Sequence, residues 1–274
     1  MIPAAFEYAR AGSVEEAVAL LGRNGDEAKL LAGGHSLLPL MKLRVASPGV
    51  LVDIGRLADL RYVRDAGDHV AIGALTRHHD VETSDLLARE VPLLRHAAGQ
   101  VGDPQVRHRG TIGGSLAHAD PAADLPAVVV ALGGTLIATG PAGERSIPAA
   151  EFFRSFFESA LAPDEVLTEV RIPKVAGRPW AFEKFNVRAQ DWAIVGVAAQ
   201  RLDRGTSVAL VNMGQTPLRA AETEAALAGG APPSDAAAVA DQGTEPPSDL
   251  NASAEYRRHL ARVLVGRALT RMAG

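Results

Sequence analysis

Two short segments, each with a pair of glycines, are the parts of this sequence best suited to chemistry. They are AGGHS (32–36) and TIGGS (111–115), and a serine directly follows each glycine pair or lies one residue beyond it. Glycine has no Cβ, so the backbone can approach a ligand closely, and successive amides in such turns form concave anion-binding sites. A diphosphate is the ligand class that suits this geometry. For either segment alone, an ordinary tight turn is the alternative.

Neither segment matches an established nucleotide-binding or hydrolase motif. The sequence has no GxGxxG, no GxxxxGK[ST] and no GxSxG, which argues against a Rossmann fold, an ATPase and a serine hydrolase. We therefore expect Ser36 and Ser115 to donate hydrogen bonds to phosphate oxygens and not to act as nucleophiles. His78 and His79 are adjacent, so they cannot share a helix face, and HExxH is absent. We expect a solvated helix face for this pair and no zinc site.

Three charged side chains are further candidates. Asp120 and Asp124 follow the second segment closely, and a carboxylate there suits a general base, an acceptor for a sugar hydroxyl or a helix cap. Lys184 lies in FEKF, where strand alternation places it on the same face as Phe182. A lysine on an apolar strand face is a candidate site residue, and a surface lysine that extends its amine to solvent is the alternative.

The hydrophobic pattern predicts the elements that position the first segment. Ser13 and Glu16 form a capping box at the start of a helix. KLLA (29–32) is a strand candidate that runs directly into the glycine pair. Pro39 then suits the first position of a short helix, where no amide hydrogen bond is lost. Further strands are expected at 50–54, 61–63 and 69–73, and helices at 76–82 and from 92 onward.

The second segment lies in HRGTIGGSLAHADPAADLP (108–126), which we expect to be irregular because it holds three glycines and two prolines. AVVVAL (127–132) favours a short helix over a strand, since Asp124 and Pro126 resemble a helix start and a glycine pair follows. TLIAT (135–139) is a predicted strand. AEFFRSFFESAL (150–161) predicts a helix with four phenylalanines on one apolar face.

A change of composition after Pro173 indicates a domain boundary, because KVAGRP (174–179) is polar and contains proline. We expect one domain at 1–175, with parts at about 1–55 and 56–175, and a second at 176–274. The second part shows three consecutive strands and then helices, typical of an antiparallel sheet covered on one face. Its segment 229–247 contains two proline pairs and is expected to be an exposed, mobile link.

Composition limits the function classes. The chain has 274 residues, with 28 Lys and Arg against 32 Asp and Glu, so its net charge of −4 does not favour nucleic acid. The absence of cysteine excludes disulfides, thiolate metal sites and cysteine-bound iron–sulfur clusters from this chain. The first residues do not have the pattern of a secretory signal, and no apolar run approaches the roughly 18 residues of a membrane span. We expect a cytoplasmic protein.

Four segments resemble the FAD-binding medium subunits of molybdenum hydroxylases, with carbon monoxide dehydrogenases most similar and xanthine dehydrogenases in the wider family. They are KLLAGGHSLLPLMKLR, RHRGTIGGSLAHADPAADLPAVVVALGG, DWAIVGVAA and AEYRRHLARVLVGRAL. The likeness extends over nearly the whole chain. It implies an α+β fold: a two-part FAD-binding domain of the vanillyl-alcohol-oxidase (PCMH) type, followed by a smaller C-terminal α/β domain with an antiparallel three-stranded sheet.

The resemblance also implies a set of FAD-binding residues and no catalytic or metal-binding residue in this chain. The FAD-binding set is Leu30, Leu31, Ala32, Gly33, Gly34, His35, Ser36, Leu37, Val101, Thr111, Ile112, Gly113, Gly114, Ser115, Asp124, Leu167, Lys184 and Trp192. Trp192 falls where related subunits often have tyrosine beside the flavin ring, and Ser115 stands where asparagine is usual. As a hypothesis, the charge of Lys184 stabilises the reduced flavin.

The implied function is electron transfer. A large subunit with the molybdenum cofactor would oxidise the substrate, and a small subunit with two [2Fe-2S] clusters would pass electrons to FAD on this chain. A dimer of such heterotrimers is expected. The substrate and the electron acceptor stay open. The alternatives are a self-contained flavin oxidase of the same fold and a flavin-free scaffold or nucleotide-binding module.

Overall fold

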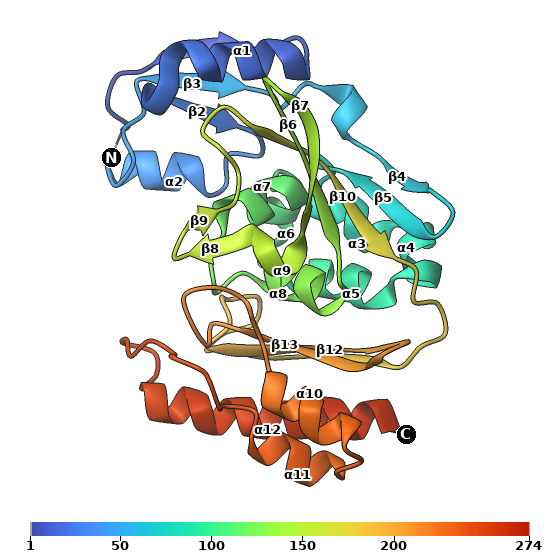
Figure 1. Cartoon of the computed structure of the whole chain (residues 1–274). Helices are drawn as coiled ribbons and strands as arrows, with labels where there is room; N and C mark the ends of the chain where they lie inside the picture. Colours follow the sequence, from blue (N-terminus) through green and yellow to red (C-terminus); the bar gives the residue numbers. More distant parts are fainter. Residues whose placement is uncertain (1, 274) are drawn as a thin grey trace.

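The computed structural model describes residues 2–273 and shows an α+β protein built from successive layers (Figure 1). Its main sheets have the strand orders β1-β3-β2, β4-β5-β10-β6-β7 and β11-β12-β13-β14. The first sheet is parallel and the other two are antiparallel. The predicted fold class is therefore confirmed. No helix among residues 2–273 has the length and apolar character needed to cross a membrane.

The first layer holds the parallel sheet, and its second strand runs into the first glycine segment. Its elements are β1 (Glu7–Arg10), α1 (Val14–Asn24), β2 (Ala28–Leu31), α2 (Leu37–Lys42) and β3 (Val50–Asp53). As predicted, Ser13 caps α1 by accepting a hydrogen bond from the Glu16 amide at 3.2 Å. Helix α2 begins two residues before Pro39, which still lies within the first turn and so costs no amide bond. Strand, glycine turn and helix follow in the predicted order.

The second layer is the five-stranded sheet with helices packed against it. Its elements are β4 (Val63–Asp65), β5 (His69–Gly73), α3 (His78–Thr83), α4 (Asp85–Glu90), α5 (Pro92–Gln100), α6 (Pro104–Arg107), α7 (Ile112–His118), α8 (Asp124–Ala131), β6 (Thr135–Gly140), β7 (Gly143–Pro148) and β10 (Val166–Pro173). Helix α8 confirms the prediction for AVVVAL. The prediction of an irregular segment over 108–126 is wrong in part, because Thr111 caps helix α7 and two glycines fit its first turn.

The predicted phenylalanine-rich helix at 150–161 is also wrong. Only α9 (Ala149–Phe152) is helical, and the hairpin of β8 (Phe153–Ser155) and β9 (Glu158–Ser159) follows it. Phe152 is fully buried, whereas the side chains of Phe156 and Phe157 are 60% and 45% exposed. The chain turns at Phe157, whose φ of 58° is incompatible with a right-handed helix. The four phenylalanines therefore share no common face.

The third layer is the C-terminal sheet with helices on one face and α5 and α8 on the other (Figure 1). Its elements are β11 (Trp180–Phe185), β12 (Val195–Leu202), β13 (Gly205–Val211), β14 (Leu218–Arg219), α10 (Ala221–Ala228), α11 (Pro233–Ala238) and α12 (Ala254–Ala273). The three predicted strands are present, and the two-residue β14 adds a fourth. The expected mobile link at 229–247 is instead partly packed, because Ala236 and Ala240 are fully buried in the core of this layer.

Candidate functional site

The first glycine segment packs against the two residues directly before the second segment. An ideal Cβ on Gly33 would lie 2.3 Å from the carbonyl oxygen of Arg109 and 2.9 Å from the Cα of Gly110. Only glycine allows so close an approach between two backbones. Gly113 is similarly confined, because its Cβ would lie 2.5 Å from the Cβ of Ala74. The missing side chain of Gly33 lets the first and second layers meet at one edge, and that of Gly113 lets helix α7 pack closely within the second layer.

The first segment presents a run of free backbone amides. Among residues 2–273, the amides of Gly33, Gly34, His35 and Ser36 donate to no protein acceptor. Gly34 has a φ of 80°, which glycine adopts without strain, and Ser36 begins α2 without a side-chain capping bond. Four successive free donors suit a group with several acceptor oxygens. This segment therefore fits the diphosphate of FAD.

The second segment differs from this expectation, because the amides of Ile112, Gly113, Gly114 and Ser115 are already bonded within the protein. The amide of Ile112 donates to Thr76 O at 3.0 Å and that of Gly113 to Ala74 O at 2.9 Å. The Gly114 amide donates to Thr111 Oγ1 at 3.1 Å. Glycine is needed here for close packing, and hydroxyl oxygens are the polar groups left to meet a ligand. The two segments look alike in sequence but offer different chemistry.

A buried ion pair links helix α8 to strand β11. Nζ of Lys184 lies 2.7 Å from Oδ2 of Asp124 and also donates to Gln100 O at 3.1 Å. The side chains of Lys184 and Asp124 are only 7% and 6% exposed. The alternatives of a surface lysine and of a side-chain helix cap at Asp124 are therefore wrong, since α8 has no side-chain capping bond.

Burial dominates the ionisation of Asp124. Loss of solvation raises the pKa of its carboxyl group to about 6, even though the charge and hydrogen bond of Lys184 act in the opposite direction. Its second oxygen, Oδ1, is buried and has no hydrogen-bond partner among residues 2–273. An unpartnered buried oxygen costs free energy, so this atom is suited to accept a hydrogen bond from a bound ligand.

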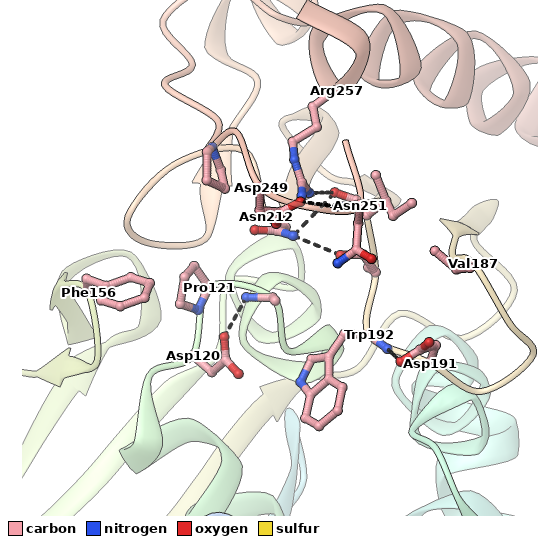
Figure 2. Close-up of a pocket in the computed structure, with 14 residues that line it drawn as sticks. Asp120, Pro121, Phe156, Val187, Asp191, Trp192, Asn212, Asp249, Asn251 and Arg257 are labelled. Carbon is pink, nitrogen blue, oxygen red and sulfur yellow. Dashed lines mark hydrogen bonds and ion pairs between the residues drawn. The ribbon is translucent and has the colours of Figure 1, made fainter. Parts of the chain in front are cut away.

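Trp192 lies at the rim of a pocket of about 400 Å³ between the second and third layers. Its side chain is 69% exposed, and Asp120 and Phe156 line the same pocket. Figure 2 shows the indole of Trp192 and the carboxylate of Asp120 at one end of the pocket, and Arg257 at the other. An exposed indole beside a pocket is free to stack on a flat ring.

Three polar residues that the sequence did not single out hold the chain next to Trp192. Asn212 donates to Ala193 O at 2.8 Å, and the guanidinium of Arg257 donates to Ile194 O. Arg257 is 1% exposed, and its Nη2 lies 2.6 Å from Oδ2 of Asp249. No sequence signal distinguished Arg257, because helix α12 carries several other arginines and Ile194 lies 63 residues away.

The structure corrects the prediction for the histidine pair. His78 is buried, and its ring lies so close to Gly110 that a Cβ there would be 2.7 Å from Cδ2. Burial and the nearby charge of Arg77 lower the pKa of His78 to about 4, so the ring is neutral at pH 7. His79 is partly exposed and packs on His108, with ring centroids 4.2 Å apart.

The remaining predicted site residues are mostly apolar and divide between two core clusters. Ile112 and Leu167 are buried in the cluster of the second layer, and Val101 packs against it. Leu30 and Ala32 pack against the cluster of the first layer. Val101 directly follows Gln100, whose carbonyl oxygen accepts the hydrogen bond from Lys184. His35 is exposed, and Leu31, Leu37 and Ser115 are half-buried.

Comparison with protein families identifies two matches along the chain. The family described as FAD binding domain in molybdopterin dehydrogenase matches residues 4–175. The family described as CO dehydrogenase flavoprotein C-terminal domain matches residues 180–272. Together they cover nearly all of the sequence.

Full-length relatives and solved structures are similar throughout. The carbon monoxide dehydrogenase medium chain of Hydrogenophaga pseudoflava is 44% identical over 279 residues, covering 98% of this chain and 97% of the relative. The 6-hydroxypseudooxynicotine dehydrogenase complex subunit alpha of Paenarthrobacter nicotinovorans is 40% identical, and the match covers 99% of this chain and 95% of the relative.

A solved carbon monoxide dehydrogenase from Hydrogenophaga pseudoflava, which lacks the Mo-pyranopterin moiety of its cofactor, has a TM-score of 0.96 at 44% identity, with 100% and 99% coverage. Quinoline 2-oxidoreductase from Pseudomonas putida 86 has a TM-score of 0.93 at 31% identity, with 100% and 98% coverage.

Proposed function

Because this chain belongs to the FAD-binding medium subunits of the carbon monoxide dehydrogenase and molybdenum hydroxylase family, we propose that it transfers electrons from a partner's [2Fe-2S] clusters to an external acceptor. Bound FAD supplies the redox chemistry, since a flavin exchanges electrons singly or in pairs. The protein contributes binding, orientation and electrostatics. The observation that carries the proposal is the run of four free amides at Gly33–Ser36, packed against Arg109 and Gly110 directly before the second glycine segment.

Each part of the proposed site has a distinct task. The amides of the first segment would hold the FAD diphosphate, and the hydroxyls of Thr111 and Ser115 would meet it from the other side. The Asp124–Lys184 pair and Trp192 would lie near the flavin ring. Asp124 offsets the charge of Lys184. The stabilisation of reduced flavin by this lysine is therefore smaller than an unpaired cation would give.

The proposed partners are a large subunit with the molybdenum cofactor and a small subunit with two [2Fe-2S] clusters, assembled as a dimer of heterotrimers. Relatives that match the whole chain are named as medium chains or subunits of dehydrogenases. The chain has no cysteine to bind an iron–sulfur cluster, so an electron donor of that kind has to come from another subunit.

We place the choice of substrate in the large partner. Relatives that match nearly the whole chain are named for carbon monoxide, glyceraldehyde, caffeine and nicotine. Similar medium subunits thus belong to enzymes that are named for chemically different substrates.

We also propose that the chain divides into domains at 1–175 and 176–274, the first with parts at about 1–55 and 56–175. Strand β10 ends at Pro173 and β11 begins at Trp180, so the connection lies between two sheets. The two family matches end and begin at residues 175 and 180, which supports this division.

The visible absorption spectrum of the purified chain, alone and with both partners, tests the proposal. We expect one FAD per chain, identified by mass after acid release, and electron flow to an acceptor only when the partners are present. A chain that binds no FAD even in the complex would contradict the proposal. Turnover by the chain alone would favour a self-contained oxidase.

A further inference from the structure

Three arginines gather beside the first glycine segment. Nη1 of Arg77 donates to the carbonyl oxygen of Arg109, the same oxygen that excludes a Cβ from Gly33. Arg61 donates to Gly55 O at 3.3 Å, and Gly55 in turn lies against Ala32 O. We name Arg61, Arg77 and Arg109 the arginine cluster. The guanidinium group of Arg77 and the backbone of Gly33, the first residue with a free amide, therefore contact the same carbonyl oxygen.

The arginine cluster has no anionic partner in the part of the chain that the structure describes. Within residues 2–273, none of its three members forms an ion pair. The charge of Asp80 acts on Arg77 and that of Asp103 acts on the neighbouring His35, and the Asp103 carboxylate accepts a hydrogen bond from the Val106 amide at 3.1 Å. The cluster therefore keeps its positive charge.

The positive charges are close enough to affect one another. Burial lowers the pKa of Arg77 below its ordinary value, and the charges of Arg61 and Arg109 lower it further. The pKa of His35, within the free-amide run, is also lowered, first by partial loss of solvation and then by the charge of Arg109. Like charges held together without a counterion cost free energy, and a bound anion would remove that cost.

We propose that the arginine cluster neutralises the diphosphate of FAD held on the first glycine segment. This inference rests on the proposed function and assigns a binding role to three residues outside the predicted site. Backbone amides supply hydrogen bonds to a diphosphate but no net charge. Guanidinium groups supply charge and paired donors, and such charge-assisted hydrogen bonds are stronger than neutral ones.

The test measures FAD release from the assembled complex by the fluorescence of free flavin, over a range of KCl concentrations. In the wild type, release accelerates with salt because screening weakens the charge contacts. We expect R77Q and R109Q each to raise the release rate about tenfold, which corresponds to about 1.4 kcal/mol. R77K should retain the salt dependence. R204Q is the matched control, because Arg204 is an exposed arginine in the β12–β13 turn.

Riboflavin separates a diphosphate contact from a general loss of structure, because it lacks the phosphates. With the flavin removed from the complex, R77Q should bind riboflavin as tightly as the wild type does. Equal losses of riboflavin and FAD, or an FAD release rate identical to that of R204Q, would overturn the inference. So would dissociation of R77Q from its partners with FAD retained, since the cluster would then be a partner contact. A wild-type complex that binds no FAD instead contradicts the proposed function itself.

Discussion

Lys184 Nζ and Asp124 Oδ2 lie 2.7 Å apart in an ion pair that joins strand β11 to the first turn of helix α8. Both side chains are more than nine-tenths buried. Charges withdrawn from water are tolerated only when they are paired. The pair therefore couples the C-terminal sheet to the layer that carries the second glycine segment.

Removing both members of this pair should cost less than the sum of the two single removals. We expect Lys184→Met to lower the free energy of unfolding by about 3–5 kcal/mol, because it leaves a buried carboxylate without a partner. The double variant Lys184→Met with Asp124→Asn should lose clearly less than the sum of the single variants. Urea unfolding of the four proteins completes the cycle, and strictly additive losses would show that the pair is not coupled.

The raised pKa of Asp124 predicts a pH dependence with a definite sign. The native carboxyl group, with a pKa of about 6, holds its proton more tightly than the unfolded one, whose ordinary pKa is about 3.9. The stability of the wild type relative to Asp124→Asn should therefore fall as pH rises from about 4 to 6, by up to about 3 kcal/mol, and level off above. Denaturant unfolding at several pH values measures this difference. A constant difference would mean that the pKa is not raised.

Gly33→Ala should move the first glycine segment away from Arg109 and Gly110, since its new Cβ would meet the Arg109 carbonyl oxygen at 2.3 Å. We expect a loss of about 1–3 kcal/mol in the free energy of unfolding and weaker FAD retention. The matched control is Gly22→Ala in helix α1, where a Cβ meets no atom within 4 Å. That variant should gain up to about 1 kcal/mol. Equal FAD content of Gly33→Ala and Gly22→Ala after gel filtration would show that the close approach at Gly33 does not affect FAD retention.

Thr111 should stabilise helix α7 through its hydroxyl group, which accepts the Gly114 amide hydrogen at 3.1 Å. Thr111→Val keeps the shape of the side chain and removes the acceptor. We therefore expect the free energy of unfolding, measured by thermal unfolding, to fall by about 1 kcal/mol. Thr111→Ser retains the acceptor and should remain close to the wild type. If Thr111→Ser and Thr111→Val lower the free energy of unfolding equally, the loss is not due to the capping hydrogen bond.

Trp192 should report flavin binding without contributing much to stability, because its side chain is 69% exposed. We expect Trp192→Phe to change the free energy of unfolding by no more than about 0.5 kcal/mol. Titration with FAD should quench tryptophan fluorescence in the wild type and in Trp180→Phe, but much less in Trp192→Phe. Undiminished quenching in Trp192→Phe would place the flavin ring away from this residue.

Local sequence patterns were sufficient where local chemistry decides the structure. The Ser13 capping box, the strand before Gly33 and helix α8 are all present, because each depends on neighbours within a few residues. The family and its cofactor FAD were predicted from the resemblance of four segments to known medium subunits. The set of FAD-binding residues stays a prediction.

Only the tertiary structure decided which side chains are buried and paired. Lys184 and Asp124 are 60 residues apart, and no pattern within either segment indicates the other. His78 was expected on a solvated face and is buried, because Gly110 provides space for its ring. The two glycine segments look equivalent in sequence, yet within residues 2–273 only the first keeps a run of free amides, since bonds to Ala74, Thr76 and Thr111 occupy the amides from Ile112 to Ser115. Whether a backbone amide finds an acceptor depends on which segments meet in space. Two motifs with similar sequences can therefore differ in whether their amides are free to bind a ligand.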